Sequence, residues 1–455
     1  MQRPADRSDL IFPAFAKLVS TFSRRGHDLL EHLLPRGLWG RSPSAIPAKV
    51  EIAVELALAL LSTRGEASGV AIARDLLQLY GEADADERRD FFLMLGERFD
   101  PDSEAIQAAW ADYQRDGASG LPKLAQAVEA PRQELFRRLN LAPGGTAMLV
   151  KMRADLLACG KVPGLDRVDA DLAHLLQSWF NRGFLSMRPI NWHSPATLLE
   201  RVIRYEAVHD IGDWDELRRR LVPDDRRCFG FFHPAMPDDP LIFVEVALTS
   251  DIPDSIQDVL AVDHSPIEAE AADTAVFYSI SNCQDGLRGI SFGHFLIKQV
   301  ADDLKRDLPH LRRFVTLSPM PGFMNWIARE DEAAFAAVSA DRWWEAEDAP
   351  SIRARVMANG VDYLADAKRA DGYPVDPVAR FHLGNGARLE RLNWLGDISP
   401  KGMKQSAGLM VNYLYEPSGI EENHEAYVQD RIVIVSPAFA YVAQGLGRSP
   451  QVKAA

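Results

Sequence analysis

Apolar residues recur at helical spacing through the first part of the chain. Between about residues 15 and 185, segments rich in Ala and Leu carry apolar side chains three and four positions apart. The spacing is clearest in two segments: Ile52, Leu56, Ala59 and Leu60, and Leu149, Met152, Leu156 and Leu157. This period predicts amphipathic helices that bury one face each.

Turn-forming residues interrupt this pattern where helices are expected to end. Breaks fall at Arg64-Gly65, at residues 117–122 and at residues 143–145, and Asp102 before Ser103 is typical of a helix N-cap. Short connections between amphipathic helices favour a bundle. We therefore predict an all-α helical domain over residues 1–188.

The pattern changes between Met187 and Pro195, where two prolines and turn-forming residues separate the helical part from a mixed part. Beyond this point, runs of β-branched and aromatic residues alternate with helical segments. The predicted strands cover residues 229–232, 241–248, 275–280, 314–317 and 432–435. The whole chain is thus predicted to be a two-domain α+β protein, with an α/β domain containing a mixed sheet over residues 189–455.

Length, charge and hydropathy narrow the classes of function. A chain of 455 residues exceeds what one hydrophobic core usually supports. Its 51 basic against 65 acidic residues give a net charge of −14, which disfavours nucleic acid as a partner. The most apolar run, around residues 54–61, is too short to span a membrane and is flanked or broken by Glu51 and Glu55.

The three cysteines, Cys159, Cys228 and Cys283, are far apart and form no C-x-x-C pair. This usage indicates neither a zinc site nor a secreted disulfide framework, and it fits the reducing cytoplasm. The sequence also shows no apolar leader and no peroxisomal C-terminal tripeptide, so a cytoplasmic location is expected.

A glycine-rich turn follows the predicted strand at residues 275–280. It leads into a helix whose apolar positions are Phe292, Phe295, Leu296, Val300 and Leu304. A loop of this kind presents backbone N–H groups at a helix N-terminus, where they favour a pyrophosphate. The spacing fits neither G-x-x-x-x-G-K-[ST] nor G-x-G-x-x-G.

The turn instead resembles the R-G-x-G-x-G loop with which GNAT acetyltransferases hold the pyrophosphate of CoA, with Ser291 in place of one glycine. The candidate substrate-binding residues are Arg288, Gly289, Ile290, Ser291, Phe292, Gly293 and His294.

Three further segments resemble malonyl-CoA decarboxylases and occur in that family's order. They are Phe277-Tyr278-Ser279-Ile280-Ser281, then Leu317-Ser318-Pro319-Met320-Pro321-Gly322-Phe323, then His382-Leu383-Gly384-Asn385-Gly386-Ala387 with Asn393-Trp394. The resemblance implies a GNAT-like catalytic domain over residues 189–455, with catalytic residues Ser318 and His382. It also implies malonyl-CoA as substrate, acetyl-CoA as product, and a homo-oligomer, dimer or tetramer. We expect the helical domain to contribute to this assembly, because it has more apolar surface than one small bundle needs to bury.

The implied reaction requires two functions from the protein. Loss of carbon dioxide from a malonyl thioester leaves an enolate, whose oxygen needs hydrogen-bond donors and whose carbon needs a proton. We expect His382, with a pKa near neutrality, to supply this proton, and Ser318 to orient the carboxylate or the imidazole. No metal or cofactor is expected, and the surroundings of Ser318 are not those of an acylated nucleophile.

Two other functions stay open at this point. A CoA-dependent acyltransferase would use the same loop and fold but would need an acceptor pocket and a general base. A catalytically silent acyl-CoA sensor would keep the loop while losing Ser318 or His382. Five other histidines show no metal-ligand spacing and are expected to be structural or exposed: His193, His209, His233, His294 and His310.

Overall fold

The computed structural model describes residues 48–62, 65–290, 296–340, 342–448 and 452–454. Contacts between Cα atoms divide the chain into two compact units, Met1–Leu175 and Leu176–Ala455. Within the described ranges, every helix is too short or too polar to span a bilayer. The division of the chain at residues 188 and 189 stays a prediction.

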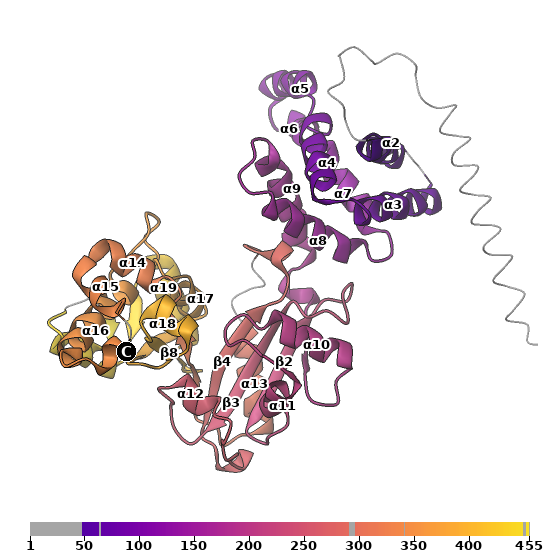
Figure 1. The fold of residues 1–455 in the computed structure, drawn as a ribbon. Helices are drawn as coiled ribbons and strands as arrows, with labels where there is room; N and C mark the ends of the chain where they lie inside the picture. Colours follow the sequence, from indigo (N-terminus) through magenta and orange to yellow (C-terminus); the bar gives the residue numbers. More distant parts are fainter. Residues whose placement is uncertain (1–47, 63–64, 291–295, 341, 449–451, 455) are drawn as a thin grey trace, which may run out of the picture. The chain divides into compact units, whose positions relative to one another are not determined.

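The described residues of the first unit form helices only (Figure 1). Their bounds are α2 Ala48–Ser62, α3 Glu66–Gly81, α4 Ala85–Arg98, α5 Ser103–Asp116, α6 Leu121–Val128, α7 Pro131–Asn140, α8 Gly145–Ala158 and α9 Leu165–Trp179. The expected break after residue 64 is present, since α3 has Gly65 as its N-cap. Asp102 caps α5 as predicted, because its side chain accepts a hydrogen bond from the backbone N–H of Glu104.

The buried face of α2 differs from the predicted one. Ile52 is 48% exposed, and the buried positions are Val50, Ala53, Val54, Ala57 and Leu60. Both sets of residues have helical spacing, because Ala, Val and Leu occur nearly all round this helix. The pattern therefore predicted the helix but not its inward face. In α8, by contrast, three of the four predicted residues are buried, namely Leu149, Met152 and Leu156, and Leu157 is half-buried.

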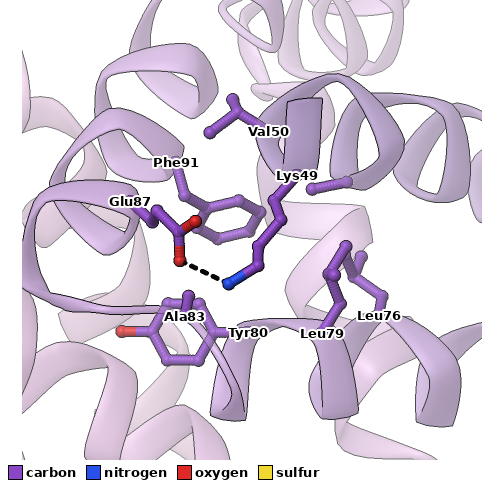
Figure 2. Close-up of a pocket in the computed structure, with 9 residues that line it drawn as sticks. Lys49, Val50, Leu76, Leu79, Tyr80, Ala83, Glu87 and Phe91 are labelled. Atoms are coloured by element: carbon purple, nitrogen blue, oxygen red, sulfur yellow. Dashed lines mark hydrogen bonds and ion pairs between the residues drawn. The ribbon is translucent and has the colours of Figure 1, made fainter. Parts of the chain in front are cut away.

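A small pocket lies between helices of the first unit. Figure 2 shows Lys49 of α2 reaching Glu87 of α4, next to the rings of Tyr80 and Phe91. The Lys49 Nζ to Glu87 Oε2 distance is 2.8 Å. Glu87 also completes a capping box with Asp84 at the start of α4, so one carboxylate stabilises both a helix end and a contact between helices.

The described residues of the second unit form a mixed sheet covered by helices. The strands are β1 Ser186–Pro189, β2 Arg226–Phe232, β3 Ile242–Thr249, β4 Thr274–Asn282, β5 Arg313–Thr316, β6 Ser318–Pro319, β7 Arg388–Asn393, β8 Met410–Tyr415, β9 Val433–Val435 and β10 Val452–Ala454. The helices are α10 Ala196–Tyr205, α11 Trp214–Leu221, α12 Ile256–Val259, α13 Leu296–Asp307, α14 Phe323–Glu330, α15 Glu332–Val338, α16 Ala349–Ala365, α17 Pro377–Gly384, α18 Pro400–Ser406, α19 Ile420–Asp430 and α20 Pro437–Gly445.

The strand order among these residues is β1-β2-β3-β4-β5-β8-β7-β9-β10, with β6 paired to β8. Strands β1 to β4 are antiparallel, β4 and β5 are parallel, and β8 is antiparallel to both β5 and β7. An all-helical unit followed by a mixed sheet is the fold class that the sequence predicts.

Strands β4 and β5 separate part-way along β4. Their register runs from Thr274↔Arg313 to Phe277↔Thr316, and the Leu317 N–H then donates to the Phe277 carbonyl at 3.1 Å. Strand β4 continues to Asn282, whereas the chain after Leu317 forms β6 and pairs with β8 only. The end of β4, residues 278–282, thus has no strand neighbour on that side among the described residues. We call this separation of the two strands the β4–β6 gap.

A β-bulge marks the start of the β4–β6 gap. Strand β3 pairs Glu245 with Ser279 and Val246 with Phe277, so Tyr278 is the extra residue on β4. Apolar side chains pack on the sheet around this position, and one cluster includes Tyr278, Val315 and Met410. The core thus fixes the place at which the two strands part.

The five predicted strands are present as β2, β3, β4, β5 and β9, with ends shifted by up to three residues. The strands that the sequence analysis did not predict include β7 and β8, which carry charged or amide side chains between apolar ones. Both lie inside the sheet, where tertiary contacts bury these polar groups.

Candidate active site

Ser318 lies where the chain leaves β5 and joins β8. It pairs with Val411, and the following Pro319 pairs with Met410. Proline cannot donate to the ladder, which fits a strand of two residues beside the β4–β6 gap. The Ser318 side chain is 6% exposed, and its hydroxyl donates to Thr316 Oγ1 at 2.9 Å.

Helix α17 brings His382 to this serine. The helix begins with Asp376, whose carboxylate accepts from the Ala379 N–H, and Pro377 occupies its first turn. His382 is in the last turn, and its Nε2 lies 3.1 Å from Ser318 Oγ. The two residues that the sequence singled out, 64 positions apart, are therefore in direct contact.

Two tyrosines of β8 hold the imidazole from other sides. The Tyr415 hydroxyl lies 2.8 Å from His382 Nδ1. The ring of Tyr413 stacks on the imidazole with centroids 4.6 Å apart and planes 25° apart. Successive side chains alternate across a strand, so Tyr413 and Tyr415 face the same side of the sheet. Together they leave His382 little freedom to rotate.

The hydrogen bonds assign a proton to one nitrogen of His382. The single Ser318 proton is directed to Thr316, so Ser318 accepts from His382 through Nε2–H. Nδ1 of a neutral imidazole is then an acceptor, and Tyr415 donates to it. A continuous chain of donors results, from Tyr415 through His382 and Ser318 to Thr316.

Burial sets the charge of this histidine. The His382 side chain is 3% exposed, and desolvation lowers its pKa to about 3. The expectation of a pKa near neutrality is therefore wrong, because desolvation lowers the pKa and no carboxylate among the described residues acts to raise it. At pH 7 roughly one ring in 10⁴ carries a proton on both nitrogens.

Two motif residues, Gly322 and Asn393, pack near this site together with residues outside the motifs. Asp376, which caps α17, accepts a hydrogen bond from the Tyr363 hydroxyl at 2.9 Å. Gly322 lies against that hydroxyl, since a Cβ at this position would be 2.4 Å from it. The Asn393 amide donates to Asn412 Oδ1 at 2.8 Å, and Asn412 donates to the Thr316 carbonyl at 2.9 Å.

The glycine-rich turn is described as far as Ile290. Gly289 has φ +80°, and a Cβ there would meet no atom within 4 Å. Arg288 is paired with Asp285 at 2.9 Å, and Ile290 is buried. The other four candidate residues lie outside the described residues: Ser291, Phe292, Gly293 and His294. Neither of two pockets seen in the described residues is lined by Ser318 or His382.

Sequence reasoning missed Tyr413 and Tyr415. The available signal was their i, i+2 spacing in an apolar run, which is that of a strand with one aromatic face. That run was not predicted as a strand, so its two tyrosines were not placed near His382.

Both parts of the chain match domains of one known enzyme family. Residues 183–451 match the malonyl-CoA decarboxylase C-terminal domain, and residues 99–180 match the malonyl-CoA decarboxylase N-terminal domain. The chain belongs to the malonyl-CoA decarboxylase family. Decarboxylases of this kind are carboxy-lyases, which is the class of enzyme that the sequence predicts.

Solved structures and curated relatives agree with this membership. The malonyl-CoA decarboxylase of Rhodopseudomonas palustris is 50% identical with a TM-score of 0.84, covering 88% of this chain and all of that one. The malonyl-CoA decarboxylase of Agrobacterium vitis is 52% identical with a TM-score of 0.82, covering 86% and 99%. The mitochondrial malonyl-CoA decarboxylase of Rattus norvegicus is 33% identical over 80% of this chain and 83% of its own.

Proposed function

We propose that this protein converts malonyl-CoA to acetyl-CoA and carbon dioxide beside Ser318 and His382. The observation that carries the proposal is the buried donor chain from Tyr415 through His382 to Ser318, at the edge of the β4–β6 gap. A thioester that enters the gap would contact the Ser318 hydroxyl. Ser318 is hydrogen-bonded to His382, and His382 is hydrogen-bonded to Tyr415.

The reaction needs a group that donates a proton to carbon rather than a nucleophile. The bond between the α-carbon and the carboxylate breaks, carbon dioxide leaves, and the electron pair stays with the thioester as an enolate. One proton then forms the new C–H bond. Neutral His382 supports a relay of three proton transfers. The Ser318 hydroxyl gives its proton to the carbon, and His382 Nε2–H then reprotonates Ser318. The Tyr415 hydroxyl gives its proton to His382 Nδ1.

This relay exchanges one neutral tautomer of His382 for the other. It avoids an imidazolium, which burial makes costly at this position. The proton consumed in each turnover returns from solvent. General acid catalysis of this type typically contributes about 10²–10⁴ in rate.

In this proposal, backbone N–H groups donate hydrogen bonds to the enolate oxygen. Residues 278–282 of β4 have no strand neighbour on the gap side among the described residues, and the bulge at Tyr278 turns the backbone there. One preorganised donor to a developing oxyanion is typically worth about 10²–10³ in rate. We assign the oxyanion site to this stretch of β4.

The CoA pyrophosphate is proposed to bind over residues 288–294. Support comes from the open space at Gly289 and from α13, which begins shortly after the loop and whose N-terminus favours an anion. The proposed ligands are the malonyl-CoA substrate and the acetyl-CoA product.

One experiment separates this function from an acyltransferase and from a silent sensor. Purified protein is incubated with malonyl-CoA alone, and carbon dioxide and acetyl-CoA are measured. Equal amounts of both products are expected. An acyltransferase without an acceptor and a sensor would release neither, and that result would overturn the proposal.

We also propose a homo-oligomer, dimer or tetramer, assembled through the helical domain. Large apolar side chains of this domain are at least 48% exposed: Ile52, Leu58, Trp110, Leu121, Val128 and Leu141. Light scattering on the eluted protein should give a mass of two or four chains. A mass of one chain would contradict the proposal.

A cytoplasmic location likewise stays a proposal. The related proteins from goose, rat and mouse are named mitochondrial. Fractionation of the source cells, followed with an antibody to this protein, would test the location.

A further inference from the structure

The loop between α10 and α11, residues 206–213, follows the unpaired end of β4. The Glu206 carboxylate accepts hydrogen bonds from the hydroxyls of Ser279, at 2.7 and 2.8 Å, and Ser281, at 3.1 Å. The Ala207 N–H donates to the Ser281 hydroxyl at 3.2 Å. These contacts fix the loop along the residues of β4 that border the β4–β6 gap.

The same loop is held from the other side by α18. Lys401 Nζ donates to the carbonyls of Ala207 at 2.6 Å and Val208 at 3.1 Å, and pairs with Asp210 at 3.2 Å. Helix α18 also contacts β6, the strand that carries Ser318. The loop therefore connects the β4 side of the gap with the β6 side.

His209 occupies the middle of this connection. The charged groups that act on it come from both sides, with Asp397 and Lys401 from the segment before and within α18 and Arg220 from α11. The backbone of Tyr278, the bulge residue, also raises the pKa of its ring.

One nitrogen of His209 is buried without a partner. Among the described residues, Nε2 has no hydrogen-bond partner and is inaccessible to solvent. Buried polar atoms of side chains are nearly always paired, so an unpaired one needs a reason. The backbone of Tyr278 raises the pKa of the ring, as a carbonyl acceptor does. Because Nε2 has no partner among the described residues, we assign the ring proton and the interaction with this carbonyl to Nδ1.

The ring is also uncharged at neutral pH. Burial, opposed by Asp397, lowers the pKa of His209 to about 4, so the ring is neutral at pH 7. Nε2 then carries a lone pair and can only accept a hydrogen bond. The ligand that completes it must offer an N–H or an O–H.

Malonyl-CoA offers few such donors near its reacting end. The carboxylate and the thioester carbonyl are acceptors only. The nearest donor to the sulfur is the amide N–H two carbons away on the pantetheine arm. We propose that His209 Nε2 accepts a hydrogen bond from this amide N–H and so fixes how far the thioester enters the β4–β6 gap. This inference rests on the proposed function.

The test compares two short substrates with and without the amide. Malonyl-S-N-acetylcysteamine keeps the N–H, and the malonyl thioester of butanethiol lacks it. One hydrogen bond is worth a factor of roughly five to ten, so His209→Ala should lower kcat/KM by that factor for the first substrate. For the second substrate the change should stay below about twofold on the same reasoning.

Two conservative variants separate hydrogen bonding from packing. A Gln side chain places a carbonyl oxygen near the position of Nε2, whereas Asn reaches only the position of Nδ1. His209→Gln should therefore retain most of the activity toward the amide substrate, and His209→Asn should behave like His209→Ala. Circular dichroism and thermal melting show whether each variant is folded.

The outcomes distinguish this inference from the proposed function. Equal losses with both thioesters, or no loss with either, would overturn the role of His209, including the case in which a water molecule completes Nε2. Wild-type protein that releases no carbon dioxide from malonyl-CoA would instead overturn the proposed function. If His209→Ala alone fails to fold, the comparison of Gln with Asn still decides the question.

Discussion

The Tyr415 hydroxyl lies 2.8 Å from Nδ1 of His382, on the side of the ring opposite Ser318. This contact fixes which nitrogen of the buried imidazole carries the proton. It also makes the serine, the histidine and the tyrosine one hydrogen-bonded unit, so a change at any of the three is expected to affect the same proton supply.

Replacing His382 should remove the proton supply while leaving CoA binding intact. We expect His382→Asn to lower kcat by about 10²–10⁴, the usual contribution of general acid catalysis. The dissociation constant for CoA, measured by calorimetry, should stay within about twofold, because the proposed pyrophosphate loop is a separate segment. Wild-type turnover by a folded variant would rule out the assignment.

Ser318→Ala should be about as damaging as His382→Asn if the serine hands the proton to carbon. The double variant should then be little worse than either single variant, since residues that act as a unit have non-additive effects. A clearly milder Ser318→Ala would instead indicate that the serine only orients the substrate or the imidazole. Steady-state kinetics on the three variants distinguishes these outcomes.

Tyr415→Phe should lower kcat by about tenfold, because one hydrogen bond to the imidazole is lost and Nδ1 is left buried without a donor. Tyr427→Phe is the matched control. The Tyr427 hydroxyl is also buried but has no partner among the described residues, so this variant should keep wild-type kcat. Equal kcat values for the two variants would count against the relay.

The stability of the protein should fall in acid because of His382. Its folded pKa of about 3 lies below the ordinary value of 6.5, so the unfolded chain binds the proton more readily. The stabilising contribution of the neutral ring is therefore present above pH 6.5 and is lost as the pH falls toward 3. Urea unfolding of wild type and His382→Asn between about pH 7 and 4 should show a steeper loss for the wild type. Parallel slopes would contradict the burial argument.

The turn at Gly289 offers a test of CoA placement. Gly289 has φ +80°, and a Cβ added there would have no atom within 4 Å, so Gly289→Val strains the backbone and fills the space proposed for pyrophosphate. CoA affinity should fall at least tenfold, by the loss of about 1.4 kcal/mol or more. Gly447→Val is the matched control, since Gly447 has φ +71° and is equally open. An unchanged affinity in folded Gly289→Val would count against the placement.

Several features could be predicted from the sequence because they depend on local patterns. The helices of the first unit, the N-cap at Asp102 and five strands of the sheet follow from residue spacing and turn chemistry. The motifs around Ser318 and His382 singled out two residues that the structure brings to 3.1 Å. The order of the motifs along the chain was enough to select these two residues, although it gave no information about the distance between them.

Other features required tertiary contacts. The inward face of α2 depends on which neighbours pack against an almost uniformly apolar helix, and its own sequence does not contain that choice. Strand β8 brings Tyr415 to His382 only after the sheet order β5-β8-β7 is formed. The low pKa of His382 arises from burial by segments far away in the chain, so a motif alone suggested the wrong value.

The sequence by itself determined the class of fold, the family and the two candidate catalytic residues, because periodicity and motifs are written along the chain. The tertiary structure decided the protonation of His382, the contact with Tyr415 and the position of His209 beside the β4–β6 gap. Each of these depends on desolvation or on hydrogen bonds between distant segments, and such interactions exist only once the segments are packed together.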